Sequence, residues 1–116
     1  MRTFLYYQDF KGAEPVKTSI GKLKANEANK VVVMLEALTS VDMLAMPYYR
    51  QFRGYLLDFG ELRIGNFRIF VHKLSENEYL LLHLFRKKSD ETPTSEIDIA
   101  LKHLQDYYYR YDQEQN

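Results

Sequence analysis

The stretch "GELRIGNFRIFVHKLSENEYLLLHLFRKK", residues 60–88, decides the fold class. It contains three runs rich in β-branched and aromatic residues, at 60–66, 67–74 and 78–87. The pair "GN" that ends the first run and the segment "SENE" before the third are turn signals of hairpin length. Strand-like runs joined this closely predict neighbouring antiparallel strands.

The chain before this stretch begins with an aromatic run at 2–7, which predicts an N-terminal strand. Apolar residues at helical spacing then predict two helices, at 15–24 and 26–45, close enough to form a helical hairpin. Asn26 is the expected N-cap of the second helix, and Pro47 is expected to stop it.

Two further segments complete the predicted domain. The run at 48–58 adds strand-like sequence, and a last helix is expected at about 94–110. We therefore predict one α+β domain spanning residues 1–116, in which a mostly antiparallel sheet follows the N-terminal strand and helical hairpin. The helices are expected to cover one face of the sheet and to leave the other open to solvent.

Composition sets limits on the protein class. The 116 residues, 46% of them hydrophobic, suit a single domain, given the rough range of 100–200 residues per domain. The chain contains no cysteine, which fits a reducing compartment. The first residues are too polar for a signal peptide, and no apolar run is long enough to span a membrane. The expectation is a soluble cytoplasmic protein.

Charge is balanced overall but unevenly distributed. Sixteen basic and sixteen acidic residues cancel, so bulk attraction to nucleic acid is not implied. Residues 47–88 carry eight basic and four acidic side chains, whereas residues 89–116 carry two and seven. This distribution is compatible with a local anion-binding surface in the middle of the chain, but charge alone favours a plain salt-bridged fold.

Strand alternation assigns the polar residues of 60–88 to one face of the sheet. The side chains predicted to face the helices are Leu62, Ile64, Phe67, Ile69, Val71, Leu80, Leu82 and Leu84. Those predicted on the uncovered face are the cations Arg63, Arg68, His83 and Lys87 with the aromatic residues Phe70, Tyr79 and Phe85. Cations among flat rings suit a phosphate and an unstacked base. A solvated face whose arginines pair with Glu61 explains the pattern as well.

Other chemistries find little support in the residues. The histidines 72, 83 and 103 lack ligand spacing for a metal, and neither a phosphate-binding glycine loop nor a nucleophile elbow is present. The tyrosines of "YYYRY", 107–111, suit packing on the last helix better than stacking on RNA. Asp90, Glu91 and Glu96 complement the dipole at the start of that helix.

The segments "GELRIGNFRIFV" and "YLLLHLFRKKSDETPTSEIDIAL", at 60–71 and 79–101, together resemble the RelE/HigB-type toxins of bacterial type II toxin–antitoxin systems. "DFKGAEPV" and "MPYYRQF" extend the similarity to the phage-derived HigB-like branch. The resemblance implies a RelE-like fold and ribosome-dependent cleavage of mRNA by attack of the ribose 2′-OH on phosphate. It implies a cognate antitoxin, often a helix-turn-helix protein. From the residues themselves we expect no cofactor or metal.

Carried over by motif, the resemblance assigns catalytic roles to four residues. Arg63 and Arg68 would bind and stabilise phosphate, Lys87 would extend the cationic cluster, and His83 is the candidate base. The predicted RNA-binding residues are Arg86, Lys88, Phe85, Tyr79 and Phe70.

Two other functions stay open at this point. One is a ParE-like inhibitor of DNA gyrase on the same scaffold, although such an inhibitor has no need of converging cations. The other is an inactive phage-derived relative, which the zero net charge and Glu91 in the turn before "TP" would support.

Overall fold

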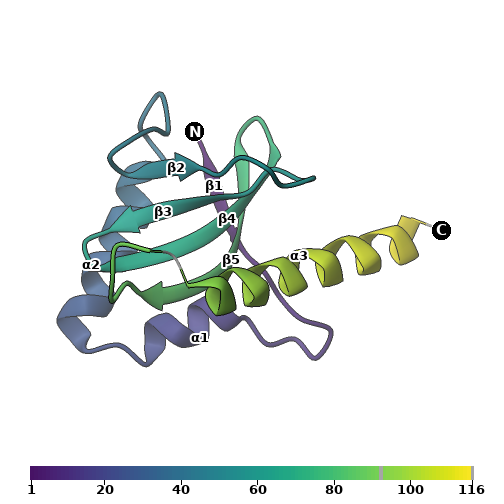
Figure 1. Ribbon diagram of the computed structural model, residues 1–116, viewed down its shortest axis with the longest axis horizontal. Helices are drawn as coiled ribbons and strands as arrows, with labels where there is room; N and C mark the ends of the chain where they lie inside the picture. The colour runs from purple at the N-terminus through teal and green to yellow at the C-terminus, as the bar shows by residue number, and fades with distance from the viewer. Residues whose placement is uncertain (92, 116) are drawn as a thin grey trace.

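A five-stranded sheet in the order β1-β5-β4-β3-β2 is the central layer of the computed structural model, which describes residues 1–91 and 93–115 (Figure 1). The elements are β1 (Thr3–Tyr6), α1 (Pro15–Gly21), α2 (Ala25–Leu38), β2 (Tyr49–Gln51), β3 (Gly60–Ile64), β4 (Phe67–Ser75), β5 (Glu78–Arg86) and α3 (Thr94–Gln115). β1 pairs with β5 in parallel, and the other pairings are antiparallel. The predicted α+β class is confirmed, and the arrangement is compatible with a RelE-like fold.

Two glycines allow the strands to meet as they do. Gly65 has a φ of 58° in the turn between β3 and β4, a conformation that residues with a Cβ adopt rarely. Gly60 begins β3 and pairs with Gln51 of β2. A Cβ added to Gly60 would come within 2.7 Å of the Tyr49 hydroxyl and 2.8 Å of the Arg50 carbonyl. The close pairing of β2 with β3 therefore requires glycine at position 60.

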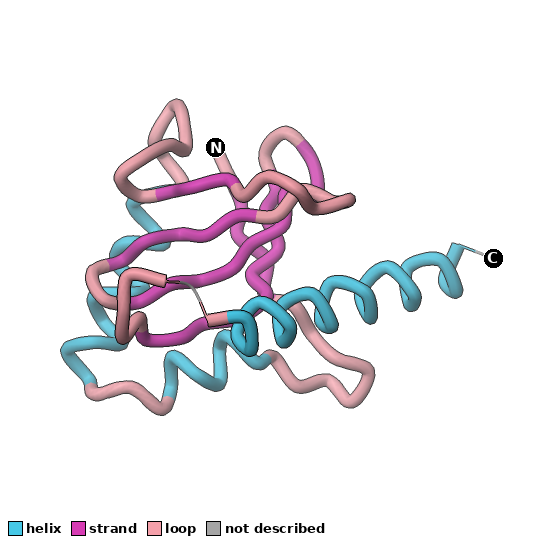
Figure 2. The backbone as a smooth tube through the Cα atoms, in the orientation of Figure 1, coloured by secondary structure: helices cyan, strands magenta, loops and turns pink. Residues whose placement is uncertain are grey.

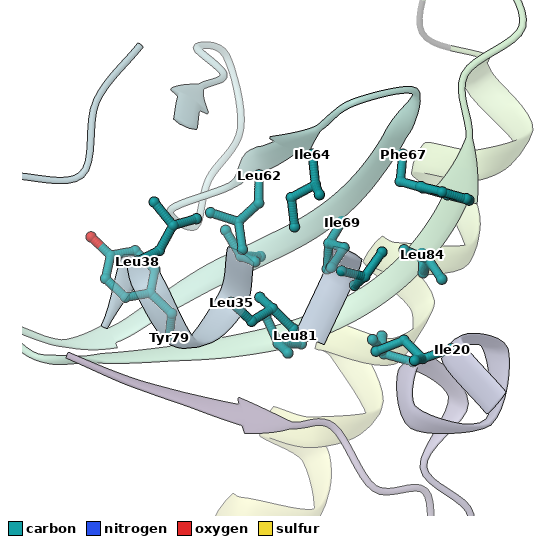
Figure 3. Close-up of a cluster of buried hydrophobic side chains, with 13 residues drawn as sticks. Ile20, Leu35, Leu38, Leu62, Ile64, Phe67, Ile69, Tyr79, Leu81 and Leu84 are labelled. Carbon is teal, nitrogen blue, oxygen red and sulfur yellow. The ribbon is translucent and has the colours of Figure 1, made fainter. Parts of the chain in front are cut away.

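Helices α1 and α2 cover one face of the sheet, with α2 behind the strands in Figure 1. Their buried side chains meet a continuous apolar surface from β3, β4 and β5, shown in Figure 3. This core consists of Val16, Ile20, Val31, Leu35, Leu38, Leu62, Ile64, Phe67, Ile69, Val71, Tyr79, Leu81 and Leu84. The predicted orientation of the apolar residues of β3 and of the first half of β4 is confirmed.

Both N-terminal helices are shorter than predicted. α2 ends at Leu38 rather than at 45, and its N-cap is Lys24 rather than Asn26. Arg2 donates hydrogen bonds to the carbonyls of Leu38 and Val41, at 2.8 and 3.0 Å. These bonds satisfy acceptors that a continuing helix would have used. The apolar stripe expected along this helix therefore ends at Leu38, and Met43 beyond it is 79% exposed.

α3 packs on the opposite face of the sheet, so the prediction that this face is open is wrong. Ala100 and Leu104 of the helix lie against Leu80, Leu82 and other residues of a second core. Figure 2 shows the helix starting beside β5 and extending beyond the sheet. α3 also runs five residues past its predicted end at 110. Its apolar stripe predicted a buried side, but periodicity does not say which surface buries it.

A β-bulge in β5 changes the predicted alternation. Phe70 lies opposite His83 and Val71 lies opposite Leu81, so Leu82 is an extra residue in β5. An extra residue reverses the alternation beyond it. Leu84 therefore faces α1 and α2, whereas Leu80 and Leu82 face α3. The prediction that these three leucines share one face is wrong.

None of the helices in the described part of the chain is long and apolar enough to cross a membrane.

Candidate functional site

Two cross-strand rows of side chains lie on the α3 side of the sheet, next to the turn at 65–66. In the first row Arg63 lies opposite Arg68, and Arg68 lies opposite Phe85. The second row, two residues further along each strand, contains Glu61, Phe70 and His83. Residues two apart on a strand share a face, so the structure brings Arg63, Arg68 and His83 to one surface.

The Arg68 guanidinium is bonded to backbone carbonyls on one side, and not all of its N–H groups have a partner among the described residues. Its Nη1 donates to the carbonyls of Gly65 at 2.8 Å and Phe67 at 2.9 Å, and the residue is only 8% exposed. Its Nε is buried and has no hydrogen-bond partner among the described residues. Burial and the neighbouring Arg63 lower the pKa of Arg68 from its ordinary value, while Glu61 opposes that shift. An anion next to the guanidinium would offset its charge.

Glu61 lies beside this arginine pair and is 1% exposed. Its Oε2 is 3.6 Å from Nε of Arg63, and neither carboxylate oxygen has a hydrogen-bond partner in the described structure. Like charges directly opposite on neighbouring strands repel. The Glu61 carboxylate offsets part of the repulsion between Arg63 and Arg68, and one positive charge of the trio stays uncompensated.

His83 is held between α3 and an aromatic ring. Its Nε2 contacts Oε2 of Glu96, in the first turn of α3. The imidazole stacks on Phe85, with centroids 5.9 Å apart and planes at 15°, and Phe85 packs on Phe70 at 5.1 Å. The imidazole is therefore restrained on two sides.

A family model for phage-derived Gp49-like proteins (DUF891) matches residues 18–105, which include both cross-strand rows and Glu96. The chain belongs to the Gp49-like family. This family of phage-derived proteins is associated with toxin–antitoxin systems. No curated protein matches the chain.

The remaining cations of this Gp49-like chain lie in different places. Lys87 is half-buried two residues after Phe85, and its backbone N–H donates to the Asn66 carbonyl at 2.7 Å. Arg86 instead pairs with Glu27 of α2 at 2.9 Å and lies over the Phe67 ring, on the side of α1 and α2. Lys88 is exposed beyond the strand. Lys87 thus follows the arginine rows, whereas Arg86 belongs to the other face.

Two of the predicted stacking residues are in the core, so their predicted place on an open surface is wrong. Phe70 is fully buried, with its ring packed against Phe52, Phe59 and Phe85. Tyr79 is 6% exposed and belongs to the core under α1 and α2, because the bulge reverses its orientation relative to His83. Of the three predicted rings, only Phe85 is partly exposed.

Sequence reasoning placed Glu96 at the helix dipole and missed its contact with His83. The two residues are thirteen positions apart, and their contact depends on α3 folding back over β5. No spacing rule of a single strand or helix could have found it. In the described residues no group of three or more histidine and carboxylate side chains could hold a metal ion.

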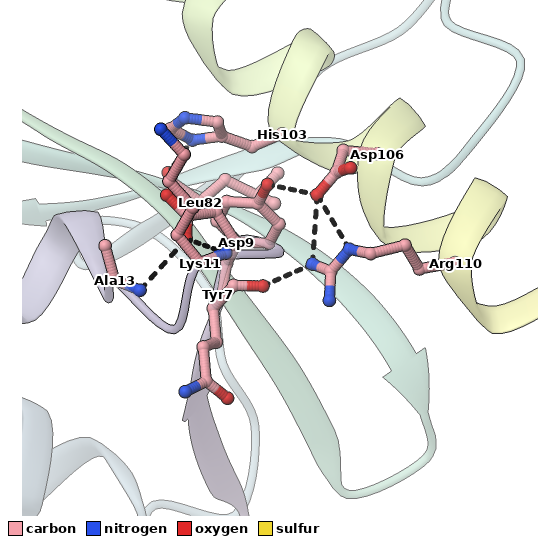
Figure 4. A network of polar contacts seen from close by, with 9 residues as sticks. Tyr7, Asp9, Lys11, Ala13, Leu82, His103, Asp106 and Arg110 are labelled. Atoms are coloured by element: carbon pink, nitrogen blue, oxygen red, sulfur yellow. Dashed lines mark hydrogen bonds and ion pairs between the residues drawn. The ribbon is translucent and has the colours of Figure 1, made fainter. Parts of the chain in front are cut away.

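A polar network fixes α3 to the sheet (Figure 4). The Tyr7 hydroxyl donates to Oδ2 of Asp106, which also accepts from Arg110 at 2.9 and 3.1 Å. Burial and then the Asp106 hydrogen bond raise the pKa of Tyr7 to about 12. The Tyr7 and Arg110 hydrogen bonds lower the pKa of Asp106.

His103 of α3 contacts the β-bulge directly. Its Nδ1 donates to the carbonyl of Leu82, the extra residue, at 2.7 Å, and its ring stacks on Tyr7 with centroids 4.5 Å apart. A bulge disrupts the local ladder of hydrogen bonds, so a side-chain donor here stabilises it. The residue that follows the bulge is His83.

Proposed function

We propose that this Gp49-like protein is the toxin of a type II toxin–antitoxin system and a ribosome-dependent endoribonuclease of the RelE/HigB type. The observation that carries the proposal is the direct opposition of Arg63 and Arg68 on one sheet face, next to Phe85 and His83. Two opposed cations on a sheet disfavour the fold unless an anion joins them. The scissile phosphate of mRNA is an anion of suitable charge, and a neighbouring base would stack on the partly exposed Phe85.

The reaction is a transesterification within the RNA strand. The ribose 2′-oxygen loses its proton and forms a bond to the adjacent phosphorus, while the bond from phosphorus to the 5′-oxygen breaks. The electron pair of that bond leaves with the 5′-oxygen, which then takes up a proton. The products are a 2′,3′-cyclic phosphate and a free 5′-hydroxyl.

Each side chain of the site has a role in this reaction. Arg63 and Arg68 stabilise the negative charge that grows on the phosphate oxygens, where fixed cations act most strongly. His83 accepts the proton of the 2′-hydroxyl, and Lys87 supplies a proton to the leaving 5′-oxygen. A positioned base and acid contribute roughly 10²–10⁴-fold each. Lys88 adds attraction to the RNA backbone.

Two kinds of partner follow from this function. The ribosome presents the mRNA in its A site, which supplies substrate positioning that a chain of zero net charge does not supply by bulk attraction. A cognate antitoxin, expected to be a helix-turn-helix protein, restrains the toxin when both are made.

The test is induced expression in a bacterium, followed by mapping of mRNA 5′ ends. The expected result is growth arrest with cuts inside codons, and loss of both in a strain that expresses Arg63→Ala with Arg68→Ala. Arrest with intact mRNA and DNA damage would replace the proposal with gyrase inhibition. Growth without arrest, at a confirmed level of folded protein, would indicate an inactive relative.

A further inference from the structure

We propose that Glu96 is a positioning residue that holds the His83 imidazole in the tautomer able to act as a base. The inference rests on the proposed nuclease function and deepens it by adding a residue from α3 to a site otherwise built from β3, β4 and β5. Glu96 does not contact the reacting atoms in this scheme, and it acts through His83 alone.

The hydrogen bond between His83 and Glu96 fixes which ring nitrogen carries the proton. Nε2 of His83 contacts Oε2 of Glu96, and an ionised carboxylate can only accept. Nε2 therefore carries the proton when the imidazole is neutral, and Nδ1 carries a free lone pair. A lone pair on a fixed nitrogen is what a general base requires.

The other ring nitrogen of His83, Nδ1, forms no hydrogen bond with a described residue. It is also not one of the buried polar atoms that lack a partner. The His83 side chain is partly exposed on the sheet face that carries Arg63 and Arg68. In the proposed reaction, Nδ1 is the atom that accepts the proton of the 2′-hydroxyl next to the bound phosphate.

Neighbouring contacts restrain both His83 and the helix that carries Glu96. Phe85 stacks on the imidazole, and His103 holds the Leu82 carbonyl of the bulge that precedes it. Asp106, Tyr7 and Arg110 fix α3 to the end of β1. The His83–Glu96 contact thus joins two elements that are each independently restrained, which favours one imidazole orientation.

The test uses the full-length chain in a purified translation system with programmed ribosomes. Glu96→Gln keeps the size of the side chain, but its amide can donate to Nε2 and stabilise the wrong tautomer. We expect a fall in kcat of about 10²-fold, the lower end of what a positioned base contributes. The KM for programmed ribosomes is expected to change less than about threefold, because His83 acts in the chemical step.

Asp98→Asn is the matched control. It removes the same charge two residues further along α3, from an exposed side chain, and we expect wild-type kcat and KM. A double variant tests the route of the effect. Glu96→Gln added to His83→Ala should slow cleavage no further than His83→Ala alone, since the two residues act as one unit. An additive loss would overturn the inference.

A spectroscopic measurement separates this inference from the proposed function. Nitrogen chemical shifts of the His83 imidazole in the free protein are expected to show the Nε2–H tautomer in the wild type and its loss in Glu96→Gln. If the wild type does not cut mRNA, the proposed function fails, yet this measurement still tests the positioning contact. The same tautomer in both proteins, or a kcat of Glu96→Gln within about threefold of wild type, overturns the inference.

Discussion

The two faces of the sheet bury their surfaces with different chemistry. Under α1 and α2 the buried core residues are apolar, apart from the hydroxyl group of Tyr79. Under α3 the sheet also carries two arginines, a glutamate and two histidines, and three of these five residues, Glu61, Arg68 and His72, are buried. Apolar burial stabilises a fold, whereas buried charges reduce its stability unless they are well paired. The comparison separates an apolar face, under α1 and α2, from a site face, under α3, which combines an apolar core with the charged residues of the candidate site.

The largest expected effect is on the apolar face. Leu81→Ala removes a fully buried side chain from the core between α1, α2 and the sheet. We expect a loss of about 2–5 kcal/mol in the free energy of unfolding, measured by urea denaturation. Leu5→Ala on edge strand β1, where the side chain is 37% exposed, is the control and should lose far less. Equal losses would mean that this face is not the stabilising core.

The next effect is on the site face. Arg68→Ala is expected to lower the rate of ribosome-dependent cleavage by about 10²–10³-fold, the usual result of removing one fixed donor to a developing oxyanion. Arg68→Lys, which keeps the charge but not the planar fork, should fall between. Thermal unfolding of each variant distinguishes a lost function from a lost fold. Full activity in folded Arg68→Ala would exclude the arginine pair as the phosphate site.

The third test replaces a charged pair of the site face with apolar side chains. Glu61→Leu combined with Arg63→Met replaces an ion pair whose carboxylate lacks hydrogen bonds with apolar side chains of similar volume. We expect the free energy of unfolding to rise by about 1 kcal/mol, since such replacements often stabilise. Cleavage should be abolished. A large loss of stability would show that the Glu61–Arg63 pair supports the fold, and the contrast between the faces would weaken.

A pH-dependent contribution comes from the network that fixes α3. Asp106→Asn is expected to lower the free energy of unfolding by about 1 kcal/mol near neutral pH. Because Tyr7 and Arg110 lower the pKa of Asp106, its carboxylate stabilises the fold above the ordinary Asp value and loses that effect in acid. The difference between wild type and variant, from urea unfolding, should therefore shrink below about pH 4. A constant difference would assign the effect to packing.

The smallest effect is expected for Arg86, the cation of the same strand that faces α2. Arg86→Ala breaks a partly exposed ion pair with Glu27, and we expect less than about 1 kcal/mol lost on unfolding. Cleavage should stay near the wild-type rate, which also tests the prediction from sequence that Arg86 binds RNA. A loss as large as that of Arg68→Ala would show that the two faces act together on the substrate.

Alternation along the strands predicted the site only up to the bulge. It correctly placed Arg63 and Arg68 on one face, because β3 and the start of β4 pair without interruption. It misplaced Tyr79 and Leu84 relative to one another, since the extra residue Leu82 reverses the pattern within β5. A bulge has no spacing signal of its own in a run such as "YLLLHLF", where every residue is compatible with a strand.

The sequence by itself determined the α+β class, the succession of a strand, two helices, an antiparallel group of strands and a last helix, and the common face of Arg63 and Arg68. These features depend on local periods of about 2 and 3.6 residues, which can be read along the chain. Only the tertiary structure decided that α3 covers the site face, that Phe70 is buried and that Glu96 meets His83. Such contacts join residues from separate elements, and their geometry is set by how the apolar surfaces of those elements pack.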